Sequence, residues 1–409
     1  MPMNLTKVFD ESELSLEVVI LMIAGLILLI TGILLFPVAT GGLSYYENGL
    51  YGLLLVMFSL QIISMGKTPF GDLKRSKLVL LAGLVVGGIG TITCFVPDAF
   101  SDIPRFMLFL FFGPGGALLL LQMILSKDKL KAWFEYGGIF KHLIAGCTVA
   151  YVSSILISIL LWNQSLLSVQ MTAIFVLIYG AAIAYLSFVL RKIYSSYPQE
   201  QKRKDGEVEL PIDRAMILFT SVFMIILGVL LIPVNLGLLP FSGSAQLGLL
   251  MMIFAIQMIA SGSTPIGVFP RSLPVILIGF VFAALGTVSC IIPEVLVYPL
   301  TVLVGVLNIL GGAISIGKFL GQRASSTDQQ KGKIPKILVK LNVSQLILNV
   351  LAIAFGLSML ISHLLPGLVI GVVLAANGVV LLYLLYILFI IDRIQKEMGT
   401  ESSLEIYQS

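Results

Sequence analysis

The chain has 409 residues, of which 58% are hydrophobic and only 11% are charged, and its formal net charge is +4. Soluble domains keep about a quarter of their residues charged because their surface faces water. The composition therefore excludes a soluble globular protein. It predicts an all-α integral membrane protein whose main partner is the lipid bilayer.

Twelve apolar runs are long enough to cross a bilayer as helices. In chain order they cover residues 18–37, 46–66, 78–97, 105–126, 141–162, 170–191, 214–234, 245–262, 273–293, 296–317, 340–362 and 367–391. We therefore expect five parts: a cytoplasmic tail (1–17), a first six-helix repeat (18–192), a cytoplasmic linker (193–213), a second six-helix repeat (214–392) and a cytoplasmic tail (393–409).

The basic residues predict the orientation. If the N-terminus lies in the cytoplasm, every one of the 25 Lys and Arg residues except Arg105 falls on the cytoplasmic side. Cytoplasmic loops of membrane proteins carry such an excess of Lys and Arg. We expect a multi-pass protein of the cell membrane with both termini in the cytoplasm.

When the sequence is shifted by 196 residues, the two predicted repeats align without a gap over about a hundred residues, whereas the last two spans of each repeat align only loosely. The matches include residue types that apolar composition alone does not produce. They are Pro37 with Pro233, Gln61 with Gln257, Arg75 with Arg271, Cys94 with Cys290, and Thr68-Pro69 with Thr264-Pro265. Six spans is an even number, so both repeats insert the same way round, as in transporters built from two parallel halves. We expect the two arginines to anchor lipid headgroups and the two cysteines to act as small packing residues.

A shorter pattern recurs within the first repeat. Ala24-Gly25-Leu26, Gly32 and Pro37 return as Ala82-Gly83-Leu84, Gly90 and Pro97. With Gly52 and Gly66, this pattern resembles the HdeD-like family, membrane proteins made of short hairpin repeats whose founding member is linked to acid resistance. The resemblance implies an inner-membrane protein of poorly defined function without a cofactor.

A Gly-x-Thr-Pro-x-Gly element ends the second span of each repeat. It comprises Gly66, Thr68, Pro69 and Gly71, and again Gly262, Thr264, Pro265 and Gly267. One interpretation is a helix stop followed by a turn, because proline removes a backbone donor and glycine permits a tight bend. The other is a symmetric pair of gates or helix breaks.

Neutral polar residues supply the candidate substrate-binding site. They are Asn308, Asn349 and Asn377, which fall near the middle of spans 10, 11 and 12, together with the symmetric Gln61 and Gln257. They could bind a small solute at the midplane. Alternatively, they form interhelical hydrogen bonds, each worth about 0.6 kcal/mol.

The middles of the spans carry no Asp, Glu, Lys or Arg, and the two histidines fall at opposite faces. We therefore predict no metal site, cofactor or nucleic-acid partner, and no enzyme activity. The leading hypothesis is a transporter or permease-like protein for a small uncharged or zwitterionic solute, with the pathway between the halves. The alternative is a non-transporting HdeD-like protein of the stress-resistance or scaffold class. An intramembrane enzyme is a weaker third hypothesis. The sequence does not determine substrate, coupling ion or oligomeric state.

Overall fold

The computed structural model describes residues 14–126, 131, 133, 135, 137–197, 210–325, 336–361 and 364–408. This part of the chain contains twelve helices that are long and apolar enough to cross a membrane, which agrees with a multi-pass membrane protein. The expected tail before residue 14 and residues 198–209 of the expected linker lie outside the described residues.

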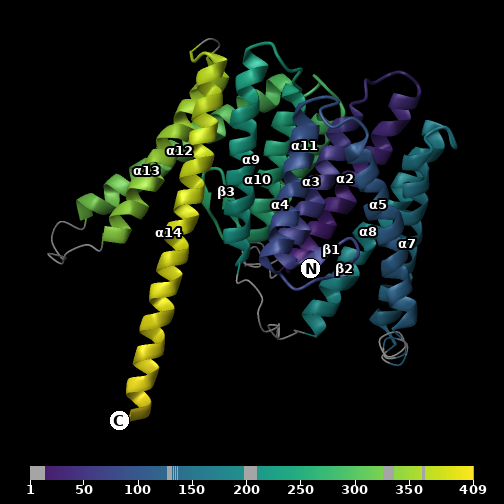
Figure 1. Ribbon diagram of the computed structural model, residues 1–409, viewed down its shortest axis with the longest axis horizontal. Coiled ribbons are helices and arrows are strands. Elements are labelled where there is room, and N and C mark those ends of the chain that lie inside the picture. Colours follow the sequence, from purple (N-terminus) through teal and green to yellow (C-terminus); the bar gives the residue numbers. More distant parts are fainter. Residues whose placement is uncertain are drawn as a thin grey trace, which may run out of the picture. The chain divides into compact units, whose positions relative to one another are not determined.

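The first six long helices follow the predicted spans closely (Figure 1). They are α2 (Leu16–Ala39), α3 (Glu47–Met65), α4 (Lys77–Phe95), α5 (Ile103–Leu125), α7 (Ile139–Trp162) and α8 (Val169–Ser196). Strands β1 (Lys67–Thr68) and β2 (Gly71–Asp72) form an antiparallel hairpin between α3 and α4. We call this set of elements the first half.

The second half has the same order of elements. Its helices are α9 (Ile212–Asn235), α10 (Gly243–Ser261), α11 (Leu273–Ile291), α12 (Val297–Ser325), α13 (Lys336–Leu360) and α14 (Gly367–Gln408). Strands β3 (Ser263–Thr264) and β4 (Gly267–Val268) form the corresponding two-stranded sheet. Helix α14 is the long yellow helix of Figure 1, and it continues through most of the segment expected to be a C-terminal tail.

The chain divides into two compact units that do not coincide with the halves. The first unit comprises Met1–Ile212, Leu239–Thr264 and Val268–Thr301, so it contains the first half together with α10 and α11. The second comprises Asp213–Leu238, Pro265–Gly267 and Val302–Ser409, and thus α9, α13, α14 and most of α12.

Glycines set the close helix packing within each unit. The α-carbons of Gly52 on α3 and Gly90 on α4 face each other's backbone so closely that a Cβ on either glycine would clash with the other's carbonyl oxygen. Gly248 on α10 and Gly286 on α11 make the same mutual contact. Small residues allow such backbone approach in a membrane, where van der Waals packing contributes much of the association energy.

The first and last helices of each half also pack through glycine. In the first unit, Gly25 of α2 lies against Ala184 of α8. In the second unit, Gly228 of α9 lies against Ala375 of α14. Each of these helix pairs therefore has a contact that admits no larger side chain.

Candidate functional site

A polar pocket of about 290 Å³ opens at one end of the first-half helices. Its lining side chains come from the start of α3, the α4–α5 loop, the start of α5 and the α7–α8 loop. They are Glu47, Asn48, Tyr51, Asp98, Ser101, Asp102, Arg105 and Gln164. We call this end (residues 39–47, 96–103 and 162–169) the acidic face, and the opposite end (residues 14–17, 65–77 and 191–197) the basic face.

Helix starts place the charged groups of this pocket. Glu47 is in the first turn of α3, where the helix dipole favours a negative charge. Asp102 is the N-cap of α5, but its side chain makes no capping hydrogen bond. Asp98 and Ser101 have positive φ angles of 58° and 47°, so the connecting loop turns sharply between the two helices.

Hydrogen bonds organise the pocket around Glu47. Its carboxylate accepts hydrogen bonds from the Tyr51 hydroxyl and from Gln164 Nε2, the latter at 2.6 Å. Asn48 Nδ2 donates to Asp98 Oδ1 at 3.1 Å. Burial, with a further contribution from Glu47, raises the pKa of the neighbouring Tyr45 well above its usual value, so that phenol stays protonated.

The guanidinium of Arg105 is held by the end of α7. Its Nε donates to Leu161 O at 2.6 Å, and its Nη2 donates to Trp162 O at 3.1 Å. The pocket therefore combines three carboxylates with one fixed guanidinium. Such a set can bind an ammonium group and a carboxylate of one small molecule at the same time.

An aromatic layer lies further along the same helices. The rings of Phe58 and Phe112 are 5.4 Å apart, and Phe58 also packs edge-on against Phe111 at 5.1 Å. Tyr179 of α8 packs perpendicular to Phe112 at 5.9 Å. Phe112 lies seven residues beyond Arg105 on α5, which corresponds to about 10 Å along the helix.

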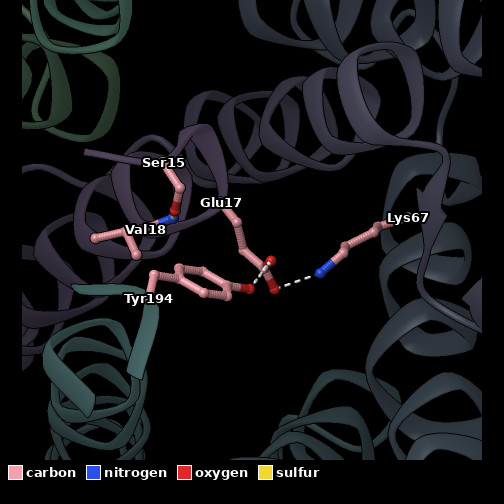
Figure 2. Close-up of polar contacts among 5 residues, drawn as sticks. All are labelled: Ser15, Glu17, Val18, Lys67 and Tyr194. Carbon is pink, nitrogen blue, oxygen red and sulfur yellow. Dashed lines mark hydrogen bonds and ion pairs between the residues drawn. The ribbon is translucent and has the colours of Figure 1, made fainter. Parts of the chain in front are cut away.

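A polar cluster occupies the basic face of the same half (Figure 2). The Glu17 carboxylate of α2 forms an ion pair with Lys67 of β1 and accepts a hydrogen bond from the Tyr194 hydroxyl of α8 at 2.7 Å. Ser15 accepts a hydrogen bond from the amide of Val18 and so begins α2 at this point. Glu17 therefore joins three elements that the sequence separates widely.

The first Gly-x-Thr-Pro-x-Gly element forms the β1–β2 hairpin. Gly66 ends α3 in the left-handed conformation, with φ of 69°, and Thr68 Oγ1 donates to Gly71 O at 2.7 Å. The carbonyl of Pro69 packs against Gly115 of α5, where a Cβ would come within 2.7 Å of the oxygen. In the second element, Gly262 also ends its helix in the left-handed conformation. The helix-stop interpretation describes this local geometry, and the gating hypothesis stays a prediction.

The residues of the predicted substrate site lie in different units. Gln61 and Gln257 are half-buried in the first unit. The three asparagines are half-buried in the second unit, and Asn308 Nδ2 donates to Val304 O of its own helix at 2.8 Å. The predicted substrate site therefore stays a prediction, and the structure offers the acidic-face pocket as a different candidate.

The sequence analysis missed the pocket because its members are loop and helix-end residues scattered from position 47 to position 164. The usable signal was that Arg105 is the single basic residue expected at that face. Arg75 and Arg271 donate hydrogen bonds to backbone carbonyls, and their expected role as headgroup anchors stays a prediction. Among the described residues, no group of three or more His, Cys, Asp or Glu is placed to hold a metal ion.

No family model, curated protein or solved structure matches this chain.

Proposed function

We propose that this protein is a permease-like protein of the cell membrane that moves a small zwitterionic solute. The observation that carries this proposal is the acidic-face pocket, in which Glu47, Asp98 and Asp102 surround a cavity beside the fixed guanidinium of Arg105. A zwitterion matches both signs of charge in the pocket, whereas a simple anion would be repelled by the three carboxylates. A ligand that lacks one of these charges would leave a carboxylate or the guanidinium without a partner.

The proposed orientation places the acidic face outside the cell and both termini in the cytoplasm. The distribution of Lys and Arg supports this orientation through the positive-inside rule. Two parallel six-helix repeats form the scaffold. Contacts that recur at positions 196 residues apart support this arrangement, among them the glycine pairs Gly52–Gly90 and Gly248–Gly286.

The pathway that we propose runs within the first half. The pocket would receive the solute, the aromatic layer around Phe58 and Phe112 would separate the two faces, and the Glu17–Lys67 pair would lie at the exit. These rings contact one another across α3, α5 and α8, so in the proposed pathway the solute would pass only when they move apart.

The alternative is a non-transporting scaffold of the stress-resistance class. The hydrogen bond of Asn308 to its own helix favours the scaffold, because this amide donates to a local carbonyl rather than to a solute. The closed aromatic layer is compatible with both functions. The pocket favours the permease proposal, because it places three carboxylates beside an arginine.

The test is uptake into proteoliposomes that contain the purified full-length chain. The probes are radiolabelled glycine, choline, acetate and glycerol, each compared with liposomes without protein. We expect glycine to accumulate fastest and acetate to stay at background. If none of the four probes enters above background while choline and glycine also fail to shift the thermal unfolding midpoint, the scaffold alternative replaces this proposal.

A further inference from the structure

Among the described residues of the first unit, four hydrogen bonds between the two halves form two crossed pairs. At the acidic face, the amide of Tyr46 donates to Ile291 O and the amide of Ser242 donates to Phe95 O, both at 2.8 Å. Tyr46 and Ser242 are 196 residues apart, and so are Phe95 and Ile291. Each half thus gives one amide and one carbonyl to the other.

The second crossed pair lies at the basic face and uses arginine. Arg75 Nη1 donates to Leu210 O, in the segment that leads into α9, at 3.1 Å. Arg271 Nη1 donates to Leu14 O, in the segment that leads into α2, at 3.2 Å. Leu14 and Leu210 are again 196 residues apart.

Each arginine also holds its own half. Arg75 Nη1 donates to Ser64 O at 3.1 Å, in the last turn of α3, and Arg271 Nη1 donates to Ala260 O at 3.2 Å, in the last turn of α10. The last carbonyls of a helix have no partner within the helix and carry partial negative charge, so a guanidinium is well suited to this position. One arginine nitrogen therefore ties a helix end to the other half.

We infer that the two halves are joined as an internal pseudo-dimer by crossed arginine clasps, in which the arginine of each half fixes the entry of the other half's first helix. The second half takes part in this interface through α10, α11 and the segment before α9, which all lie in the first unit. A self-complementary interface of this kind is what a twofold homodimer requires.

Two cysteines lie at the same contact between the halves. The Cys94 thiol contacts Gly49 O at 3.4 Å, and a Cβ on Gly49 would clash with the carbonyl of Cys290 from the other half. Both cysteine side chains are fully buried. The contact between the halves is therefore closely packed as well as hydrogen-bonded at both faces.

The clasps are tested in the full-length chain by measuring how accessible positions 14 and 210 become when either arginine is replaced. Cys94, Cys147 and Cys290 are first replaced by serine. A single cysteine then replaces either Leu14 or Leu210, whose side chains are 8% and 6% exposed. Labelling by a hydrophilic maleimide is measured in open membranes. We expect Arg75→Gln to accelerate labelling at position 210 at least fivefold and to leave position 14 unchanged, with the reverse pattern for Arg271→Gln.

The matched control is Lys74→Gln, which changes an exposed neighbouring charge and should alter neither rate. Arg75→Lys and Arg271→Lys are used where a glutamine variant fails to purify as a monodisperse protein. An uncrossed pattern, equal acceleration at both positions, or no acceleration at either position in folded protein overturns the inference. None of these outcomes depends on an uptake assay, so the permease proposal can fail separately.

Discussion

The two halves of the protein keep the same packing positions but differ in polar chemistry. Gly52 and Gly90 have equivalents in Gly248 and Gly286, with the same mutual contacts. In the acidic-face pocket, by contrast, Glu47 corresponds to Gly243, and Arg105 corresponds to Thr301. Positions that hold helices together have stayed alike, whereas the charged pocket belongs to the first half alone.

The basic face shows the same contrast. Lys67, which pairs with Glu17, corresponds to Ser263 in the second half. There, Arg214 of α9 instead forms an ion pair with Asp392 of α14 at 3.3 Å. Both halves join their first helix to their last through polar side chains, but with different residues. The comparison teaches that the scaffold is shared and that the candidate site is not.

The largest effect is expected from the shared glycine contacts. Gly52→Leu and Gly248→Leu should both prevent recovery of folded protein, because a side chain would have to displace the backbone of α4 or α11. Overpacking typically costs about 1–3 kcal/mol, and more where backbone must move. Monodisperse yield by fluorescence-detected gel filtration measures this. Gly317→Leu, at a position with open space around it, is the control. Normal recovery of either leucine variant would break the comparison.

The second-largest effect, on solute uptake, is expected from the acidic-face pocket, which the second half lacks. Asp98→Asn should reduce glycine uptake by about ten- to a hundredfold, because a hydrogen bond to a charged group contributes about 1.5–3 kcal/mol. The matched control is Glu294→Gln at the equivalent position of the second half, which should leave uptake within about twofold. Equal losses in both variants would mean that the halves share the function, contrary to the comparison.

A smaller effect is expected at Asn308, which corresponds to Phe112 of the aromatic layer. Asn308→Leu should change the free energy of unfolding by about 0.6 kcal/mol, since its amide donates to the carbonyl of Val304 in its own helix. Thermal unfolding and glycine uptake are both measured. A loss of uptake beyond tenfold with unchanged stability would restore Asn308 to the substrate site.

The smallest effect is expected for Lys67→Ser, which gives the first half the residue of the second. The Lys67 and Glu17 side chains are 36% and 22% exposed, so solvent screens their attraction and the loss of stability should stay below about 1 kcal/mol. The shift in thermal unfolding midpoint should also shrink when salt is raised. A shift larger than that of Glu17→Gln would show that Lys67 acts through another partner.

The sequence predicted the spanning helices because the length of an apolar run is a local property. An apolar run of about 20 residues predicts a spanning helix wherever it lies in the chain. The bounds of α2 to α5 therefore lie within a few residues of the predicted spans. The role of Gly66 as a helix end was likewise readable, because glycine adopts the left-handed conformation without steric cost.

The candidate site could not be predicted from the sequence in the same way. Glu47, Arg105 and Gln164 meet only because α3, α5 and the α7–α8 loop end together. Likewise, Arg75 and Leu210 are 135 residues apart, and no local pattern indicates that a guanidinium meets that carbonyl. The sequence by itself determined the spans, their helix ends and the equivalence of residues 196 apart, because these depend on local hydrophobicity, turn chemistry and direct comparison. Only the tertiary structure decided which charged ends share a pocket and which half each arginine holds, because helix packing brings distant side chains together.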